Sequence, residues 1–223
     1  MEISISPEIA AKVDGFKVGF IHYKGIEVGA SPQMLKGRLQ LFQESIFFDL
    51  QEKPVTEIDG VAQWREIFKS VGKDPNRYRH SAEALYRRIK KQNYLQTINS
   101  AIDLNNFFSL QYEVPIGIYD LDKLKGDRIE LRLGSEGETY TGLNGRENSL
   151  ENLIVACDNE GPFGSPFVDS SKAPVGEETQ NAVQIIFLKP SLSLEDSEML
   201  TKSLMDMFIS IHGGEGRFSI SEG

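Results

Sequence analysis

The stretch SAEALYRRIKKQNYLQTINSAIDLNNFFSLQYEVPIGIYD, residues 81–120, contains the change of pattern that decides the fold. Its beginning predicts an amphipathic helix, because Ser81 suits an N-cap and Leu85 and Ile89 recur at helical spacing. Residues 98–113 mix polar and apolar side chains and are interpreted as a mixed segment. From residue 114 onward, short β-strands are predicted.

The C-terminal half of the chain alternates short apolar stretches with turn signals. Asn144-Gly145 is typical of a β-hairpin turn. A series of short strands predicts an α+β fold with a β-rich, barrel-like core and flanking helices. The predicted strands are VPIGIYD (114–120), RIELRLG (128–134), ETYTGL (138–143), NLIVACD (152–158) and AVQIIFL (182–188).

The N-terminal part predicts a strand pair and two helices. FKVGFI (16–21) and IEVGA (26–30) form the pair, and Ser31-Pro32 opens the first helix. A second helix over 61–71 makes Trp64 a core anchor.

The C-terminal part predicts a helix over 193–211 and then a mobile polar tail, 213–223. The inward positions of this helix are Leu194, Leu200, Leu204, Met207 and Phe208. We therefore expect one domain over 1–223, divided into an N-terminal strand and helix elaboration (1–72), a core (73–190), and a C-terminal helix with its tail (191–223).

Composition excludes several classes of protein. The net charge of −9 argues against a general nucleic-acid coat and against DNA as a partner. A single cysteine, Cys157, and three scattered histidines match no common metal or redox motif, so we expect no metal and no cofactor. The N-terminus lacks a signal-peptide pattern and no stretch is long enough to span a bilayer, which predicts a cytoplasmic protein without a membrane partner.

One basic block stands out in this acidic chain. Residues 73–91 hold seven Lys and Arg against Asp74 and Glu83, a net charge of +5, which leaves −14 for the remainder. A basic helix on a surface is more often a solvated face, but so concentrated a block in an acidic protein raises the odds of a phosphate-bearing partner. The predicted tRNA-binding residues are Lys73, Arg77, Arg79, Arg87, Arg88 and Lys91.

Several ordered motifs resemble the B3/B4 domain of the phenylalanyl-tRNA synthetase beta subunit. That family carries an Arg-Arg-Leu helix, then Asn-x-Val-Val-Asp-x-Thr-Asn-Tyr, then Pro-Met-His-Ala-Phe-Asp. The corresponding stretches here are Arg87-Arg88-Ile89, Asn99–Phe107 and Val114–Asp120, and the likeness covers about 81–187. GKDPNRYR (72–79) and GPFGSPFVDSS (161–171) are similar to free-standing B3/B4-type proteins.

The resemblance implies an editing-type hydrolase that deacylates mischarged tRNA in trans. It covers no aminoacylation part, so phenylalanine-tRNA ligase activity is not expected. Carried over by position, Asn105 and Asn106 orient the aminoacyl group or water, and Asp169 is the acid or base. The implied substrate-binding residues are Gly117, Tyr119, Asp120, Phe163, Gly164 and Ser165, with the backbone of 163–165 as an oxyanion site.

One departure from the family leaves the activity open. Gly117 stands where the family has a histidine, which predicts a larger cleft bounded by Tyr119 and by Phe163 or Phe167. The alternative is a non-catalytic module that binds tRNA or an amino-acid-like ligand in the same pocket. A third interpretation, a small-molecule hydrolase or transferase without RNA, is disfavoured by the basic block.

Overall fold

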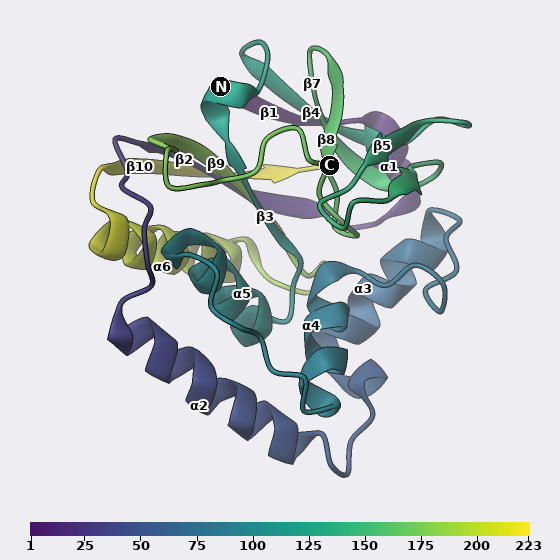
Figure 1. The fold of residues 1–223 in the computed structure, drawn as a ribbon. Helices are drawn as coiled ribbons and strands as arrows, with labels where there is room; N and C mark the ends of the chain where they lie inside the picture. Colours follow the sequence, from purple (N-terminus) through teal and green to yellow (C-terminus); the bar gives the residue numbers. More distant parts are fainter.

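The strands form two four-stranded sheets and one short hairpin in the computed structural model, which describes all residues 1–223 (Figure 1). One sheet has the order β1-β4-β7-β8 and the other β10-β2-β9-β3. The chain is α+β as predicted, but the sheets form no closed barrel. The strands are Glu2–Ile5 (β1), Lys17–Lys24 (β2), Ile116–Asp120 (β3), Arg128–Leu133 (β4), Thr139–Thr141 (β5), Glu147–Ser149 (β6), Ile154–Asp158 (β7), Gly161–Gly164 (β8), Asn181–Phe187 (β9) and Glu215–Glu222 (β10).

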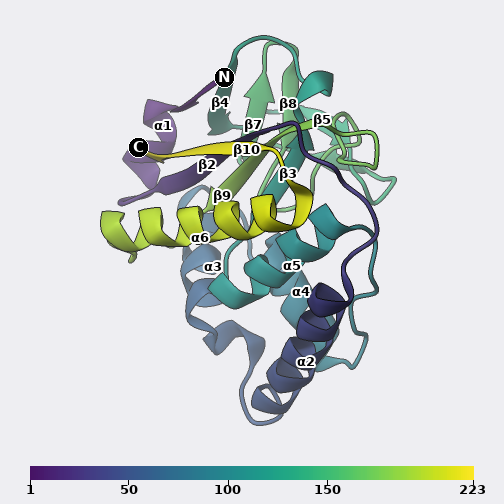
Figure 2. The same cartoon turned by 90° about the vertical axis from the view of Figure 1, so that its left-hand side faces the viewer.

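The helices lie mainly on one side of the two sheets. Figure 2 shows α6 running beneath the β10-β2-β9-β3 sheet, with α5 beside it and α2 farther out. No helix is both long and apolar enough to cross a membrane. The helices are Pro7–Lys12 (α1), Gln33–Asp49 (α2), Asp59–Ser70 (α3), Ser81–Lys90 (α4), Ser100–Tyr112 (α5) and Leu194–His212 (α6), with short 3₁₀ turns at Val55–Glu57 (η1) and Leu121–Lys123 (η2).

Strand β9 is buried on both faces and joins two hydrophobic cores. Val183 and Ile185 face the first sheet and share a core with Trp64 of α3. Ala182 and Ile186 face the other way and pack with residues of α5 and α6. A strand between two cores needs apolar residues at consecutive positions, which is the pattern of NAVQIIF.

The predicted mobile tail is instead strand β10. It pairs antiparallel with β2 over its whole length, from Glu215 opposite Lys24 to Glu222 opposite Lys17. Phe218 and Ile220 pack against the second core, while the intervening residues are exposed. Polar and apolar side chains alternate along β10, as expected for a strand with one solvent-exposed face.

The mixed segment 98–113 is largely helix α5. The Asn99 side chain caps it by accepting a hydrogen bond from Ile102 N, and Asp103 accepts one from Ser31 Oγ at 2.5 Å. Asp103 and Ser31 are buried because they pair with each other, and Asp103 therefore interrupts the apolar period that marks a helix in the sequence.

One expectation for the N-terminal part and one for the C-terminal helix need correction. Residues 26–30 are not a strand, because Ile26 N bonds to Gln180 O and Glu27 N to His212 O instead of to β2. The predicted helices α2, α3 and α6 are confirmed. However, Leu194, expected to face inward, is 47 % exposed at the start of α6.

Candidate functional site

Asp169 and Tyr119 form the central polar pair of the candidate site. Tyr119 Oη donates to Asp169 Oδ1 at 2.6 Å, and Ser165 N donates to the same oxygen at 3.3 Å. Asp169 Oδ2 has no hydrogen-bond partner within the protein. Although the residue is partly exposed, desolvation of its carboxylate raises its pKa to about 6. The site thus holds a carboxylate that titrates near neutral pH and keeps one oxygen free.

The tyrosine ring fills the space that the missing histidine was predicted to vacate. A Cβ atom added to Gly117 would lie 2.0 Å from Tyr119 Oη, and one added to Gly164 would lie 2.2 Å from the same atom. The two glycines thus form a slot for the hydroxyl. Phe163 packs edge-on against the Tyr119 ring, with 4.8 Å between the two ring centres. The cleft is therefore not enlarged here as predicted, because the Tyr119 side chain occupies the space beside Gly117.

Gly117→Ala is expected to destabilise the protein by about 1–3 kcal/mol, since overpacking forces neighbouring groups to shift. The rigid phenol ring and the β3 backbone leave little room for the new methyl group. Urea denaturation compared with Gly29→Ala, where a Cβ meets nothing within 4 Å, measures the difference. Equal stability of the two variants would contradict this packing.

The two asparagines of α5 differ in their surroundings. Asn105 is buried, with its amide nitrogen donating to Ile116 O at 2.8 Å and its oxygen accepting from Gln184 Nε2 at 2.9 Å. These bonds tie α5 to β3 and β9, so the amide is not available to a ligand. Asn106 is partly exposed and its side chain makes no hydrogen bond within the protein.

The loop predicted as an oxyanion site is held by its own hydrogen bonds. Ser165 N points to Asp169, and Ser165 Oγ accepts from the backbone nitrogens of Phe167 and Val168 at 3.2 and 3.1 Å. Ser165 is itself buried. This backbone therefore orients Asp169 and offers no free N–H at Ser165 to an oxyanion.

Asp120, predicted to bind substrate, also has partners of its own. Its Oδ2 accepts from Thr179 Oγ1 at 2.8 Å and pairs with Lys123 Nζ at 3.1 Å, while Oδ1 accepts from Asp122 N. The carboxylate joins the end of β3 to the segment before β9. We assign it to the scaffold behind the site.

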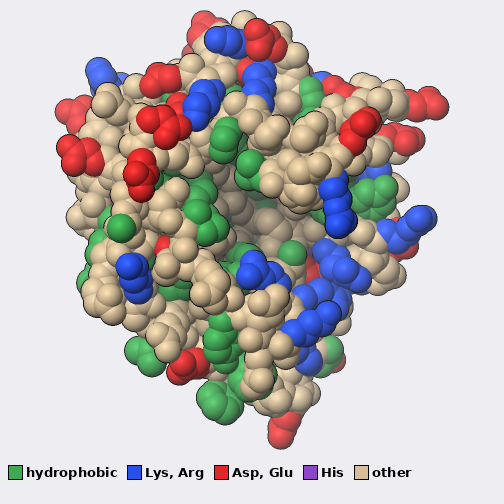
Figure 3. All heavy atoms as spheres, in the orientation of Figure 1, with side chains coloured by type: hydrophobic (Ala, Val, Ile, Leu, Met, Phe, Trp, Pro, Cys, Tyr) green, Lys and Arg blue, Asp and Glu red, His purple; other side chains and the backbone are tan.

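The space-filling view shows a hollow in the face over β3, with Lys and Arg side chains gathered on its flank towards α3 and α4 (Figure 3). Arg77, Arg79, Arg88 and Lys91 are exposed as predicted. Lys73 is only 8 % exposed, and its Nζ lies 4.3 Å from the centre of the Tyr78 ring. The basic block is therefore exposed only in part.

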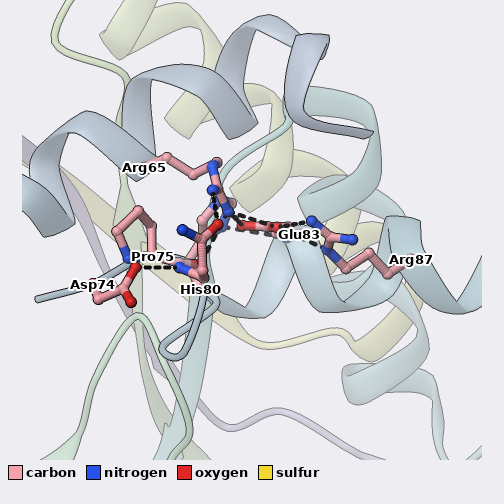
Figure 4. A network of polar contacts seen from close by, with 7 residues as sticks. Arg65, Asp74, Pro75, His80, Glu83 and Arg87 are labelled. Atoms are coloured by element: carbon pink, nitrogen blue, oxygen red, sulfur yellow. Dashed lines mark hydrogen bonds and ion pairs between the residues drawn. The ribbon is translucent and has the colours of Figure 1, made fainter. Parts of the chain in front are cut away.

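A buried ion network anchors this basic surface. Glu83 is fully buried and pairs with Arg65 at 3.0 Å and Arg87 at 2.8 Å (Figure 4). Arg65 also donates to Pro75 O and Asn76 Oδ1. Arg87, predicted to contact tRNA, is thus held by a carboxylate. The sequence placed Glu83 in the first turn of a helix and carried no sign of its burial.

His80 sits beside this network without carrying a charge. Its Nδ1 accepts from Glu83 N at 3.3 Å, so His80 and not Ser81 caps α4. Burial lowers the pKa of His80 to about 3, and its Nε2 has no hydrogen-bond partner. The neutral ring therefore serves as a cap packed on Trp64 and Phe68.

Two further candidate nucleophiles are enclosed in the core. His212 Nε2 lies 2.8 Å from Ser100 Oγ, with Nδ1 2.8 Å from Phe208 O, but both side chains are buried. Burial raises the pKa of the Cys157 thiol to about 12, which leaves it protonated. Neither group reaches the candidate site.

Comparisons with known proteins relate this chain to the B3/4 domain and to the phenylalanine–tRNA ligase beta subunit. A family model described as the B3/4 domain matches residues 63–197. The Bacillus subtilis (strain 168) protein YhzB is 35 % identical over 214 residues, which cover 96 % of each chain. The phenylalanine–tRNA ligase beta subunit of Bifidobacterium longum is 34 % identical over 110 residues, 48 % of this chain and 12 % of that one.

A solved structure, an N-terminal fragment of the phenylalanyl-tRNA synthetase beta subunit from Pyrococcus horikoshii, aligns with a TM-score of 0.48 and 17 % identity. The alignment covers 97 % of this chain and 50 % of that one. The chain thus spans nearly all of YhzB but only a small part of the matched ligase subunit.

Proposed function

Because the chain belongs to the B3/4 domain family, we propose that it binds tRNA and hydrolyses the ester bond of a mischarged aminoacyl-tRNA in trans. The observation that supports this most is Asp169, whose pKa is raised to about 6 and whose Oδ2 is unpartnered. A general base works best when its pKa lies near the operating pH.

In the proposed reaction, Asp169 Oδ2 takes a proton from a water molecule as the water oxygen attacks the ester carbonyl. The bond between the carbonyl carbon and the ribose oxygen then breaks, and the ribose oxygen takes the proton from Asp169, which regenerates the carboxylate. Tyr119 and Ser165 N hold Oδ1 and thereby fix the direction of Oδ2. The free amide of Asn106 is the candidate donor to the developing oxyanion.

Arg88 and Lys91 are the sharpest test of tRNA binding, because both are exposed and neither forms an ion pair within the protein. We expect Arg88→Gln/Lys91→Gln to make the slope of log K for tRNA binding against log [salt] less negative by about 1–2. The reason is that fewer counterions are released when the protein contacts fewer phosphates.

The matched control is Arg128→Gln/Arg146→Gln, which removes the same charge from exposed positions on β4 and in the loop between β5 and β6. Fluorescence anisotropy with labelled tRNA at several salt concentrations measures both slopes. If the two double variants change the slope equally, the basic surface over α4 is not the contact.

The alternative function is a non-catalytic module that binds tRNA or an amino-acid-like ligand. It is favoured by the closed slot around Tyr119 and by the engaged N–H of Ser165. The deciding experiment incubates the purified chain with a panel of correctly and incorrectly charged tRNAs. Release of amino acid from a mischarged member supports the hydrolase; binding without release across the panel supports the module.

A further inference from the structure

A cleft over the paired strands β2 and β10 gathers two cationic side chains, Lys24 and Arg217, and the titratable His22 away from the candidate site. It has a volume of about 250 Å³ and is lined by His22, Lys24, Glu215, Gly216 and Arg217. The register places His22 directly opposite Arg217 and Lys24 opposite Glu215. Side chains two positions apart on one strand share a face, so all four charged or titratable groups lie on the same side of the sheet.

The cations in this cleft have no anionic partner within 4.0 Å. Lys24 and Arg217 take part in none of the ion pairs of the protein. The neighbouring strand adds no charge, because Val183 and Asn181 of β9 lie opposite His22 and Lys24. Lys24 and Arg217 are diagonal neighbours on one face of the strand pair, where like charges repel, and a bound anion would reduce this repulsion.

The cleft is held in shape by a tight contact between chain segments. Gly214 adopts a left-handed conformation, with φ of 73°, and a Cβ there would lie 2.4 Å from Lys24 O. Only glycine allows this approach, which fixes the start of β10 against the end of β2. The cationic side chains are thus carried on a well-defined backbone.

We propose that this cleft binds a small oxyanion of the sulfate and phosphate class, held between Arg217 and Lys24 with His22 at its inner wall. Glu215 lies opposite Lys24 and moderates the positive charge. Arginine offers planar paired donors to such an anion, and lysine adds a point charge. This site is independent of the proposed action on tRNA.

His22 provides the readout. Its pKa is lowered by burial first, and then by the amino group of Met1, Arg217 and Lys24. An anion among these cations favours the protonated ring, so sulfate should raise the pKa of His22 by about one unit at saturation. Sulfate is the probe because it stays dianionic throughout the titration. NMR of the imidazole signals measures the shift, with chloride at equal ionic strength as the reference.

The variants separate a specific site from general screening. Arg217→Gln should raise the pKa of His22 without sulfate, because a nearby cation is lost, and should abolish the sulfate-dependent rise. Arg146→Gln removes an exposed charge elsewhere and should preserve that rise. The buried His80 and His212 should not respond and serve as internal references.

Equal effects of sulfate and chloride, or a sulfate effect that survives Arg217→Gln, would overturn the proposal. A nucleoside 5′-monophosphate then distinguishes two sources of the same chemistry. Half-saturation at a concentration ten-fold or more below that of sulfate assigns the cleft to a phosphate ester. Similar concentrations assign it to the free oxyanion.

Discussion

Asp169→Asn is expected to lower trans-deacylation of a mischarged tRNA by about 10²–10⁴-fold, the usual contribution of a general base. The asparagine retains an oxygen that can accept from Tyr119, but it cannot take a proton from water. Affinity for tRNA should not change, because the Asp169 carboxylate would act on the attacking water and not on the phosphate backbone. Release of labelled amino acid under single-turnover conditions measures the loss.

The pH profile gives a second readout for Asp169. Only the ionised carboxylate accepts a proton, so wild-type activity should rise as pH increases through about 6. The variant should lose this rise. Asp127→Asn, at an exposed position, is the matched control and should behave as wild type. Full activity in Asp169→Asn would exclude this base and leave water positioning by Asn106 as the mechanism.

Unfolding should not explain the loss of activity. The folded-state pKa of Asp169 is raised above its usual value of 3.8. The folded state therefore binds this proton more tightly than the unfolded state. The resulting stabilisation is complete below the unfolded pKa and is lost as pH rises through about 6. At pH 7, replacing the ionised group should leave the protein at least as stable.

Glu83→Gln is expected to reduce the free energy of unfolding by about 3–5 kcal/mol, as removing one member of a buried ion pair typically does. Glu83 is fully buried, and its loss leaves Arg65, only 13 % exposed at its side chain, without a counter-charge. Urea denaturation at pH 7 measures the change.

The control for Glu83 is Glu66→Gln, which breaks the exposed pair with Lys69 and should cost less than about 1 kcal/mol. Both variants remove one negative charge, so their difference isolates the effect of burial. A result for Glu83→Gln within 1 kcal/mol of the control would mean that the network contributes little. Glu83→Gln should also weaken tRNA binding, because Arg87 and the 74–80 segment lose the buried carboxylate that holds them in place.

Elements with a strong local period could be predicted from the sequence. The helix over 61–71 and the anchoring role of Trp64 follow from apolar spacing, and most of the predicted strands follow from short apolar stretches between turns. Segment 98–113 shows no clear period, because buried polar groups such as Asp103 and Asn105 interrupt it. Strand β10 has the weak, half-polar pattern of an exposed edge strand, so its sequence predicts a polar tail instead.

The sequence by itself determined the α+β class, the acidic surface with one basic block, and the motifs shared with the B3/4 domain. Only the tertiary structure decided which of these residues are free to act. Tyr119 and Asp169 are separated by 50 positions, and their contact depends on two glycines on different strands. Glu83 and Arg65 are paired across two helices. Such contacts depend on packing between distant segments, which no local pattern of residues encodes.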